Sequence, residues 1–318
     1  MRTILTTSAA EAAEVLKKGG LAAFPTETVY GLGAAVFNER ALENIFEAKQ
    51  RPADNPLIVH IANLEQIGLL TSTLKTGVTA SAEKFIAAFF PGPLTLVLPK
   101  TEKVSSLVTA GLDTVGIRMP GNELAREFLR LCETPVAAPS ANLSGRPSPT
   151  TWQAVREDLD GRIDCILQGA ETEVGLESTV VDCTGEVPQV LRSGAITLEQ
   201  LREVAPETKA AIVDPALVPK SPGLKHKHYS PRARVILVND ISETVPGLQN
   251  AFIGKGYPEI EGFGLAQNCH SVTEYAHAVF EFFRECDRRA IETIYCQKVA
   301  AEGLGTALMD RLQRAAQT

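Results

Sequence analysis

The sequence lacks an apolar run long enough to form a membrane-spanning helix. Its longest apolar stretch, residues 85–98, is interrupted by Pro91, Gly92 and Pro93, whereas a helix that crosses a bilayer needs about 20 consecutive apolar residues. Residues 1–20 contain neither an apolar block of secretory length nor a small-residue cleavage pattern. We therefore expect a cytoplasmic protein with no membrane partner.

Clustered metal ligands are also lacking. The six cysteines are never closer than ten residues apart, and the sequence contains no CxxC or HExxH motif. A structural zinc site needs such a cluster. We therefore expect reduced cysteines in the core, and the sequence identifies no side chain as a metal ligand.

Positive charge is scarce as well. Thirty-one Lys and Arg residues face 38 Asp and Glu residues, which leaves a net charge of −7. A protein that holds a nucleic-acid duplex usually has the opposite balance, so we expect no stable duplex binding.

The GxxxxGK[ST] phosphate loop, a GxGxxG motif after a strand and the GxSxG elbow of serine hydrolases do not occur. An anionic ligand must therefore be held in another way.

The chain length of 318 residues predicts about two domains, at roughly 150 residues each. Mixed strand and helix patterns predict an α/β domain over residues 1–205. Residues 206–234 contain five prolines and a run of basic residues without an acid, which is typical of a linker. Residues 235–318 follow a strand–helix–strand–helix order, which predicts a small parallel, Rossmann-like sheet.

Apolar periodicity and capping residues predict the individual elements. In the first domain we expect helices at 41–49, 122–132, 151–159 and 197–204, and strands at 21–24, 57–61, 94–98, 115–118, 136–138, 179–182 and 190–191. Gly31-Leu32-Gly33 is expected to form a flexible turn after the strand that ends at Phe24. In the second domain we expect strands at 235–238, 262–266 and 294–296 and helices at 271–289 and 306–316.

Polar side chains collect where the expected strands end, which is where α/β sheets build their sites. The residues concerned are hydroxyl, amide, imidazole and cationic side chains: Thr26, Glu27, Thr28, Tyr30, Lys49, Arg51, Asn55, His60, Arg118, Ser140, Asn142, Ser144, Ser148, Ser178 and Arg192. Hydroxyl groups, close-approaching backbone amides and arginines suit phosphate and carboxylate. The pattern favours a nucleotide or a phosphorylated small molecule as the ligand.

Plainer interpretations of these residues stay open. Lys49 and Arg51 could satisfy the last carbonyls of a helix instead of binding phosphate. His60 could be a structural histidine in a strand, and the 140–148 segment could be an ordinary serine-rich turn.

Six segments that contain many of these residues occur in the same order in the threonylcarbamoyl-AMP synthase family, which this sequence therefore resembles. The catalytic unit of that family is the YrdC-like domain. They are FPTETVYGLG (24–33), Lys49-Gln50-Arg51, FPGPLTLVL (90–98), VGIRMP (115–120), Ser140-Ala141-Asn142 and GLESTVVD (175–182). The resemblance covers about residues 5–200. The basic segment SPGLKHKHYSP (221–231) and the remaining C-terminal residues are similar to those of the long, two-domain form.

The resemblance implies a fold and a reaction. The fold would be a YrdC-like twisted mixed sheet with flanking helices, followed by a small Rossmann-like parallel α/β domain. The reaction would convert ATP, L-threonine and bicarbonate to threonylcarbamoyl-AMP, pyrophosphate and water. Mg²⁺ would arrive with ATP, and the product would pass to the tRNA threonylcarbamoyl transferase machinery, which modifies adenosine in tRNA.

The resemblance also implies roles for individual residues. The catalytic residues would be Lys49, Arg51, Ser140 and Asn142. The ATP-binding residues would be Arg51, Asn55, Thr114, Ser140, Ser148, Arg192 and Tyr229. The threonine-binding residues would be Thr28, His60, Arg118, Ala138 and Ser178, with Arg118 holding the carboxylate.

Two other functions remain possible. One is a carbamoyl-adenylate-forming enzyme of the kind found in hydrogenase-maturation proteins, although this chain lacks their acylphosphatase and zinc-finger modules. The other is a non-catalytic RNA-binding module with a basic concave face. The segment 221–231 has two interpretations as well: a lid that closes over the triphosphate and brings Tyr229 to the nucleotide, or a solvated basic spacer.

Overall fold

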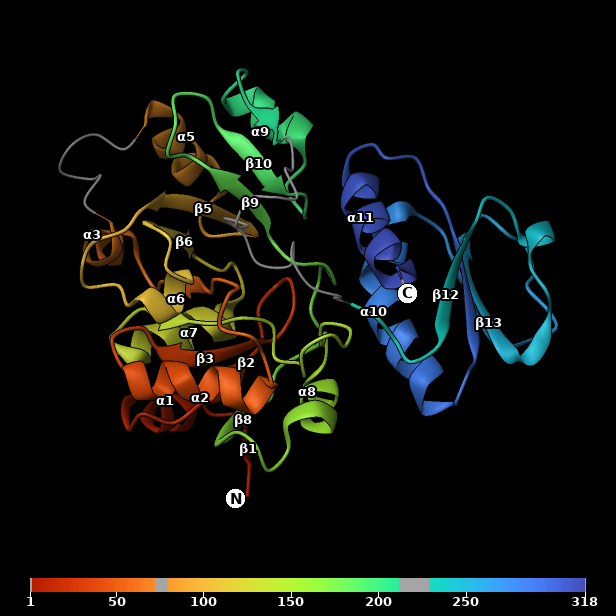
Figure 1. The fold of residues 1–318 in the computed structure, drawn as a ribbon, viewed down its shortest axis with the longest axis horizontal. Helices are drawn as coiled ribbons and strands as arrows, with labels where there is room; N and C mark the ends of the chain where they lie inside the picture. The colour runs from red at the N-terminus through yellow and green to blue at the C-terminus, as the bar shows by residue number, and fades with distance from the viewer. Residues whose placement is uncertain (1, 72–78, 212–228, 318) are drawn as a thin grey trace.

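The computed structural model describes residues 2–71, 79–211 and 229–317. Figure 1 shows two α/β domains side by side, with the helices α10 (Val272–Arg288) and α11 (Leu304–Ala316) between the larger domain and the strands of the smaller one. None of the helices in these three ranges has the length and apolar content that a membrane crossing requires.

The larger domain is built on an eleven-stranded mixed sheet. The strands lie in the order β1 (Ile4–Thr6), β8 (Cys165–Leu167), β2 (Ala22–Phe24), β3 (Gly31–Ala35), β7 (Val136–Ala137), β4 (Ile58–His60), β6 (Thr114–Arg118), β5 (Leu94–Pro99), β9 (Thr179–Asp182), β10 (Gln189–Arg192) and β11 (Lys209–Ala210). Strand β11 lies in the segment expected to be a linker, yet it pairs in parallel with β10. The sheet of the larger domain therefore extends to residue 210.

Helices flank this sheet, and local capping explains where several of them begin. They are α1 (Ala9–Lys17), α2 (Glu39–Lys49), α3 (Ile67–Leu70), α5 (Ala80–Phe89), α6 (Ser106–Thr109), α7 (Glu123–Cys132), α8 (Trp152–Leu159) and α9 (Leu198–Val204), with a 3-10 turn at Leu64–Gln66. Asn38 caps α2, Asn122 caps α7, and Thr197 with Gln200 forms a capping box at α9. Apolar faces of these helices cover the sheet and form the core.

The segment Gly31-Leu32-Gly33 is not a turn, as the sequence led us to expect, but part of strand β3. It pairs antiparallel with β2, with Gly33 opposite Ala22. A Cβ atom at Gly33 would lie 2.8 Å from Cγ1 of Val136, so glycine is needed here for close packing rather than for a turn. The chain reverses earlier, over residues 25–30, and that reversal carries the polar side chains of this segment.

The smaller domain has a four-stranded sheet in the order β12 (Arg234–Val238), β15 (Thr293–Gln297), β13 (Gly247–Lys255) and β14 (Phe263–Cys269). All neighbouring strands are parallel, as predicted. Strand β13 was not predicted: its first half shows no alternation, and the buried apolar run in its second half, residues 251–254, is short. A second 3-10 turn spans Ile241–Glu243.

The six cysteines are all free and buried, which confirms the prediction of reduced core thiols. Burial raises their pKa values; that of Cys132, for example, rises to about 12. At neutral pH these thiols are therefore protonated and unreactive.

Candidate active site

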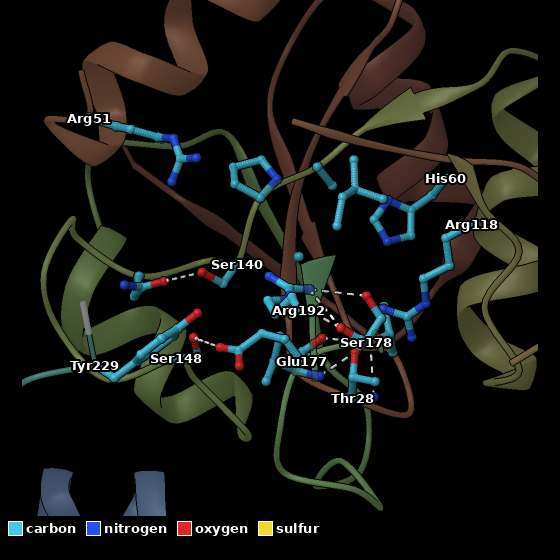
Figure 2. Close-up of a pocket in the computed structure, with 17 residues that line it drawn as sticks. Thr28, Arg51, His60, Arg118, Ser140, Ser148, Glu177, Ser178, Arg192 and Tyr229 are labelled. Atoms are coloured by element: carbon cyan, nitrogen blue, oxygen red, sulfur yellow. Dashed lines mark hydrogen bonds between the residues drawn. The ribbon is translucent and has the colours of Figure 1, made fainter. Parts of the chain in front are cut away.

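A pocket lies where the ends of β4, β6 and β10 and the segments before β3 and β9 meet (Figure 2). It is lined by Thr26, Thr28, Val29, Gly31, Arg51, Ile58, His60, Arg118, Ala138, Pro139, Ser140, Asn142, Ser148, Glu177, Ser178, Arg192 and Tyr229. The structure thus brings together eleven of the fourteen residues assigned to substrates or catalysis: Thr28, Arg51, His60, Arg118, Ala138, Ser140, Asn142, Ser148, Ser178, Arg192 and Tyr229.

Arg118 stands at one end of this pocket, at the end of β6. Its Nη1 donates to Oγ1 of Thr28 at 2.9 Å, and its Nε donates to the Gly92 carbonyl at 3.3 Å. Its Nη2 lies 2.7 Å from Oε1 of Glu27, and both side chains are buried. This buried ion pair and the two hydrogen bonds hold the guanidinium in one orientation beside the pocket.

His60 lies beside Arg118 because β4 and β6 are parallel neighbours in which these two residues are opposite each other. Burial and, to a lesser extent, the charge of Arg118 lower the pKa of His60 to about 3. The imidazole is therefore neutral at physiological pH. Its Nδ1 is buried without a hydrogen-bond partner among the described residues, so the ring can accept or donate a hydrogen bond to a ligand but cannot act as a cation.

Ser178 and Arg192 join this end of the pocket to the strands behind it. Nε and Nη2 of Arg192 donate to the Ser178 carbonyl at 3.1 and 3.0 Å, and Nη2 also donates to Oγ of Ser178 at 3.1 Å. The Ser178 hydroxyl contacts Oγ1 of Thr95 at 2.8 Å. A buried guanidinium thus fixes the backbone that enters β9.

Arg51 provides positive charge on the other side of the view in Figure 2, beyond Ser140. Helix α2 ends at Lys49, and Gln50 takes the left-handed conformation, which turns the chain so that Arg51 faces the pocket. Its Nη2 donates to the carbonyls of Asn55 and Pro56 at 3.2 and 3.4 Å. Burial lowers the pKa of Arg51 to about 10, so the side chain remains charged at neutral pH.

Lys49 lies behind the pocket wall rather than in it. Only 1% of its surface is exposed, and Nζ donates to the Ser140 carbonyl at 2.5 Å, to the Asn142 carbonyl and, at 3.4 Å, to Oδ1 of Asn142. Burial and the nearby charge of Arg51 lower the pKa of Lys49 well below its usual value. Through these hydrogen bonds the Lys49 side chain organises the loop that carries Ser140 and Asn142.

That loop is fixed from several directions. The Ala141 amide donates to the Tyr30 carbonyl at 2.8 Å, and Ser140 forms an isolated bridge with Gly31. Ser140 Oγ donates to Oδ1 of Asn142 at 2.6 Å, while the Asn142 amide nitrogen donates to the carbonyls of Leu143 and Arg146. The asparagine is thus held in one orientation, with its oxygen toward Ser140.

Ser148 and Tyr229 complete the pocket near the smaller domain. Ser148 Oγ donates to Oε1 of Glu177 at 2.6 Å. Tyr229 is buried, has a φ of 66°, and stacks on Phe280 of α10 with ring centroids 5.4 Å apart. The contact with α10 places Tyr229 at the pocket, whereas residues 221–228 of the expected lid lie outside the described residues.

Lys49, Asn55 and Thr114 are the three assigned residues that do not line this pocket. Asn55 is buried and accepts from Arg51 through its carbonyl. Thr114 lines a separate narrow cavity with Pro56 and Gly116.

Glu177 is a pocket residue that received no role from the sequence. The available signal was its position directly before Ser178, together with the excess of arginines predicted for the site, since buried cations need a carboxylate nearby. In the described part of the chain, no three His, Cys, Asp or Glu side chains are grouped so that they could hold a metal ion.

Comparisons with known proteins show the family to which the chain is similar. A family model described as "Telomere recombination" matches residues 14–194, and one described as "Threonylcarbamoyl-AMP synthase, C-terminal domain" matches residues 196–317. The threonylcarbamoyl-AMP synthase of Pyrococcus abyssi is 44% identical over 96% of this chain and 92% of the relative, and that of Bacillus subtilis is 40% identical over 96% and 92%.

A solved structure is similar as well. The crystal structure of Pyrococcus abyssi Sua5 complexed with L-threonine superposes with a TM-score of 0.89 at 39% identity, and the match covers 99% of this chain and 97% of that chain. The matches extend over both domains, which favours the synthase over the carbamoyl-adenylate and RNA-binding alternatives. The chain therefore belongs to the threonylcarbamoyl-AMP synthase family, in its two-domain form.

Proposed function

We propose that the pocket is the active site in which this chain carries out the reaction of its family, the formation of threonylcarbamoyl-AMP and pyrophosphate from ATP, L-threonine and bicarbonate. One observation carries the assignment of the site. Arg118 and Arg51 lie on opposite sides of the same pocket, and Arg192, which the family resemblance assigns to ATP, lies between them (Figure 2). Such a pocket suits one ligand with a carboxylate and another with phosphates.

The Arg118 end binds threonine. The guanidinium faces the amino-acid carboxylate, and Thr28 and Ser178 offer hydroxyl groups to the polar atoms of the substrate. His60 contributes a neutral ring with an unpartnered Nδ1. A neutral histidine adds a hydrogen bond without repelling the ammonium form of threonine, which a charged histidine would do.

The other end binds the nucleotide. Arg51 faces the phosphates, with Ser140 and Asn142 beside it and Ser148 and Tyr229 further toward the smaller domain. The fixed orientation of Asn142 and the carbonyls held by Lys49 mean that this loop needs little rearrangement when ATP binds. A loop that is already fixed before the substrate binds avoids the cost of reorganisation when charge develops in a transition state.

The reaction has two steps in this arrangement. The threonine amine first attacks the carbon of bicarbonate or carbon dioxide and forms a carbamate; the amine loses a proton, and with bicarbonate one water molecule leaves. A carbamate oxygen then attacks the α-phosphorus of ATP, and pyrophosphate leaves. Arg51 stabilises the negative charge on the phosphates as it is redistributed, and burial of the pocket protects the adenylate from water.

Mg²⁺ enters as part of the ATP substrate. Glu177 is the carboxylate on the pocket wall, and it is already engaged by Ser148 and by an ion pair with Arg311. A magnesium ion that binds mainly through phosphates and water fits such a site. We place the reaction in the cytoplasm and the catalytic chemistry in residues 1–205. The product would pass to the tRNA threonylcarbamoyl transferase machinery.

Pyrophosphate release from ATP tests the function directly, with threonine and bicarbonate each omitted in turn and the adenylate identified by mass spectrometry. We expect release only when all three substrates are present. Release that is independent of threonine would show that the chain is an ATP hydrolase and not a synthase.

A further inference from the structure

Arg311 of the smaller domain reaches the wall of the active site without lining it. It lies on α11 and is fully buried (0% exposed). Its Nε donates to Oε2 of Glu177 at 2.9 Å, its Nη2 donates to the Ser193 carbonyl at 3.1 Å, and its guanidinium carbon lies 5.3 Å from the ring centroid of Tyr229. Because Glu177 and Tyr229 do line the pocket, Arg311 connects the smaller domain to the nucleotide end of the site.

The charges around Glu177 determine its protonation state. Burial alone would raise the pKa of Glu177, but Arg311 and Arg192, together with the hydrogen bond from Ser148, lower it below its usual value. Tyr229 and Asp310 are the other titratable groups close to this ion pair. Glu177 is therefore a carboxylate at neutral pH, and a carboxylate can only accept hydrogen bonds.

This protonation state fixes the direction of the hydrogen bond between Ser148 and Glu177. The two oxygens are 2.6 Å apart, and the proton between them must come from the serine. A hydroxyl has one proton and two lone pairs, so Ser148 has only lone pairs left for a ligand. Phosphate oxygens, which are acceptors themselves, are poor partners for it, whereas hydroxyl and amino groups are good ones.

We propose that Arg311 is a positioning residue of the nucleotide site. By keeping Glu177 ionised it holds Ser148 as a hydrogen-bond acceptor for a donor group of the nucleoside, either a ribose hydroxyl or the adenine amino group. The inference rests on the proposed function, because it takes ATP to be the ligand at this end of the pocket. It also gives the smaller domain a role in substrate recognition.

The same domain interface contains a matched control. Arg288 of α10 forms ion pairs with Glu157 of the larger domain at 2.8 Å, at a partly exposed position. Neither residue lines the pocket. Arg288→Met thus removes an arginine from the interface between the domains and leaves Glu177 untouched.

The first experiment measures KM for ATP and for threonine from about pH 6 to about pH 9 in the full-length parent, Arg311→Met, Arg311→Lys and Arg288→Met. Without Arg311 the pKa of the buried Glu177 rises, so at the acidic end its carboxyl takes up a proton and Ser148 loses its fixed direction. KM for ATP should then be about tenfold higher than in the parent at about pH 6 and return toward the parent value at about pH 9.

The other variants should behave differently. Arg311→Lys keeps the charge and should restore most of the affinity, and Arg288→Met should follow the parent at every pH. KM for threonine should stay unchanged throughout. An increase in KM for ATP that is equal at all pH values and matches a loss of folding stability would mean that Arg311 is merely structural, and the proposal would be wrong.

The second experiment identifies the donor and remains informative even if Arg311→Met does not fold. Parent and Ser148→Ala are compared with ATP, 2′-deoxyATP, 3′-deoxyATP and the triphosphate of purine riboside, which lacks the amino group. One analogue should raise KM about tenfold in the parent, and Ser148→Ala should bind that analogue and ATP equally well. If the parent does not distinguish ATP from any of the three, the inference fails. Absence of threonine-dependent turnover in the parent itself would instead overturn the proposed function.

Discussion

Replacement of Lys49 and of Arg51 separates two kinds of contribution to the same site. Lys49 and Arg51 are two positions apart, and the resemblance of this segment to the family implies that both are catalytic. The structure places them differently. Arg51 lines the pocket, whereas Nζ of Lys49 contacts two backbone carbonyls and one side-chain oxygen behind the loop 140–142. We therefore expect Arg51→Met and Lys49→Met to fail in different ways.

Lys49→Met leaves the carbonyls of Ser140 and Asn142 buried without a donor, while Oδ1 of Asn142 keeps its bond from Ser140. A buried carbonyl that loses its partner costs about 1–3 kcal/mol, so the free energy of unfolding should fall by about 2–6 kcal/mol. Methionine has a similar length and fills the space, which limits any additional penalty from a cavity. Activity should fall as well, because the loop loses its fixed position.

Arg51→Met removes charge from the phosphates and leaves the core intact. Turnover should fall about a hundredfold or more, as it does when a donor to a developing charge is lost. The free energy of unfolding should fall less than in Lys49→Met, because the bonds from Arg51 to the carbonyls of Asn55 and Pro56 are long and only partly buried. Urea denaturation and pyrophosphate release, measured on the same preparations, test both expectations. A Lys49→Met protein as stable as the parent but with strongly reduced turnover would refute the assignment of Lys49 to the loop.

Three further predictions follow from the same site. The folded-state pKa of His60 is about 3, below its unfolded value of about 6.5. Because the unfolded chain then binds the proton more tightly, the protein loses stability as the pH falls below about 6.5. In urea titrations from about pH 7.5 to about pH 5, the unfolding free energy of the parent should fall by about 2 kcal/mol more than that of His60→Gln. Serine should replace threonine with kcat/KM only ~3–10-fold lower, because one methyl group contributes about 1 kcal/mol, and equal values for threonine and glycine would contradict a threonine pocket. The isolated fragment 235–318 should not hydrolyse ATP, since the pocket is lined by the larger domain and Tyr229; hydrolysis by this fragment would place chemistry in the smaller domain.

The sequence predicted much of the pocket because local rules determine where its residues emerge. His60, Arg118 and Arg192 each end a strand, and Ser178 precedes one, so identification of the strands also placed the side chains. Most of the predicted strands lie within one or two residues of their observed ends, whereas β14 ends three residues beyond the expected end at Ala266. Strands β8 and β13 were missed because their buried apolar runs, Cys165–Leu167 and 251–254, are short. Strand β11 has two exposed residues and forms where β10 offers hydrogen-bond partners.

The contacts between the domains were beyond sequence reasoning. Glu177 and Arg311 are 134 positions apart, and Asp158 and Arg284 are 126 apart. Local propensity contains no information about which acid meets which arginine at such separations. Figure 1 shows that α10 and α11, the helices that carry Arg284 and Arg311, face the larger domain.

A weaker signal was nevertheless present in the helices themselves. Lys49 follows Leu42, Ile45 and Phe46 on the apolar face of α2, and Arg311 lies between Leu308 and Leu312 on the buried side of α11. A cation on the apolar face of a helix cannot remain unpaired in a core, so its position alone predicts a buried oxygen on another element. Lys49 meets carbonyls of the loop 140–142, and Arg311 meets a carboxylate of the other domain. In both cases the partner belongs to the wall of the active site. A cation on the apolar face of a predicted helix therefore marks, in this sequence, a side chain that helps to hold the wall of the active site in place.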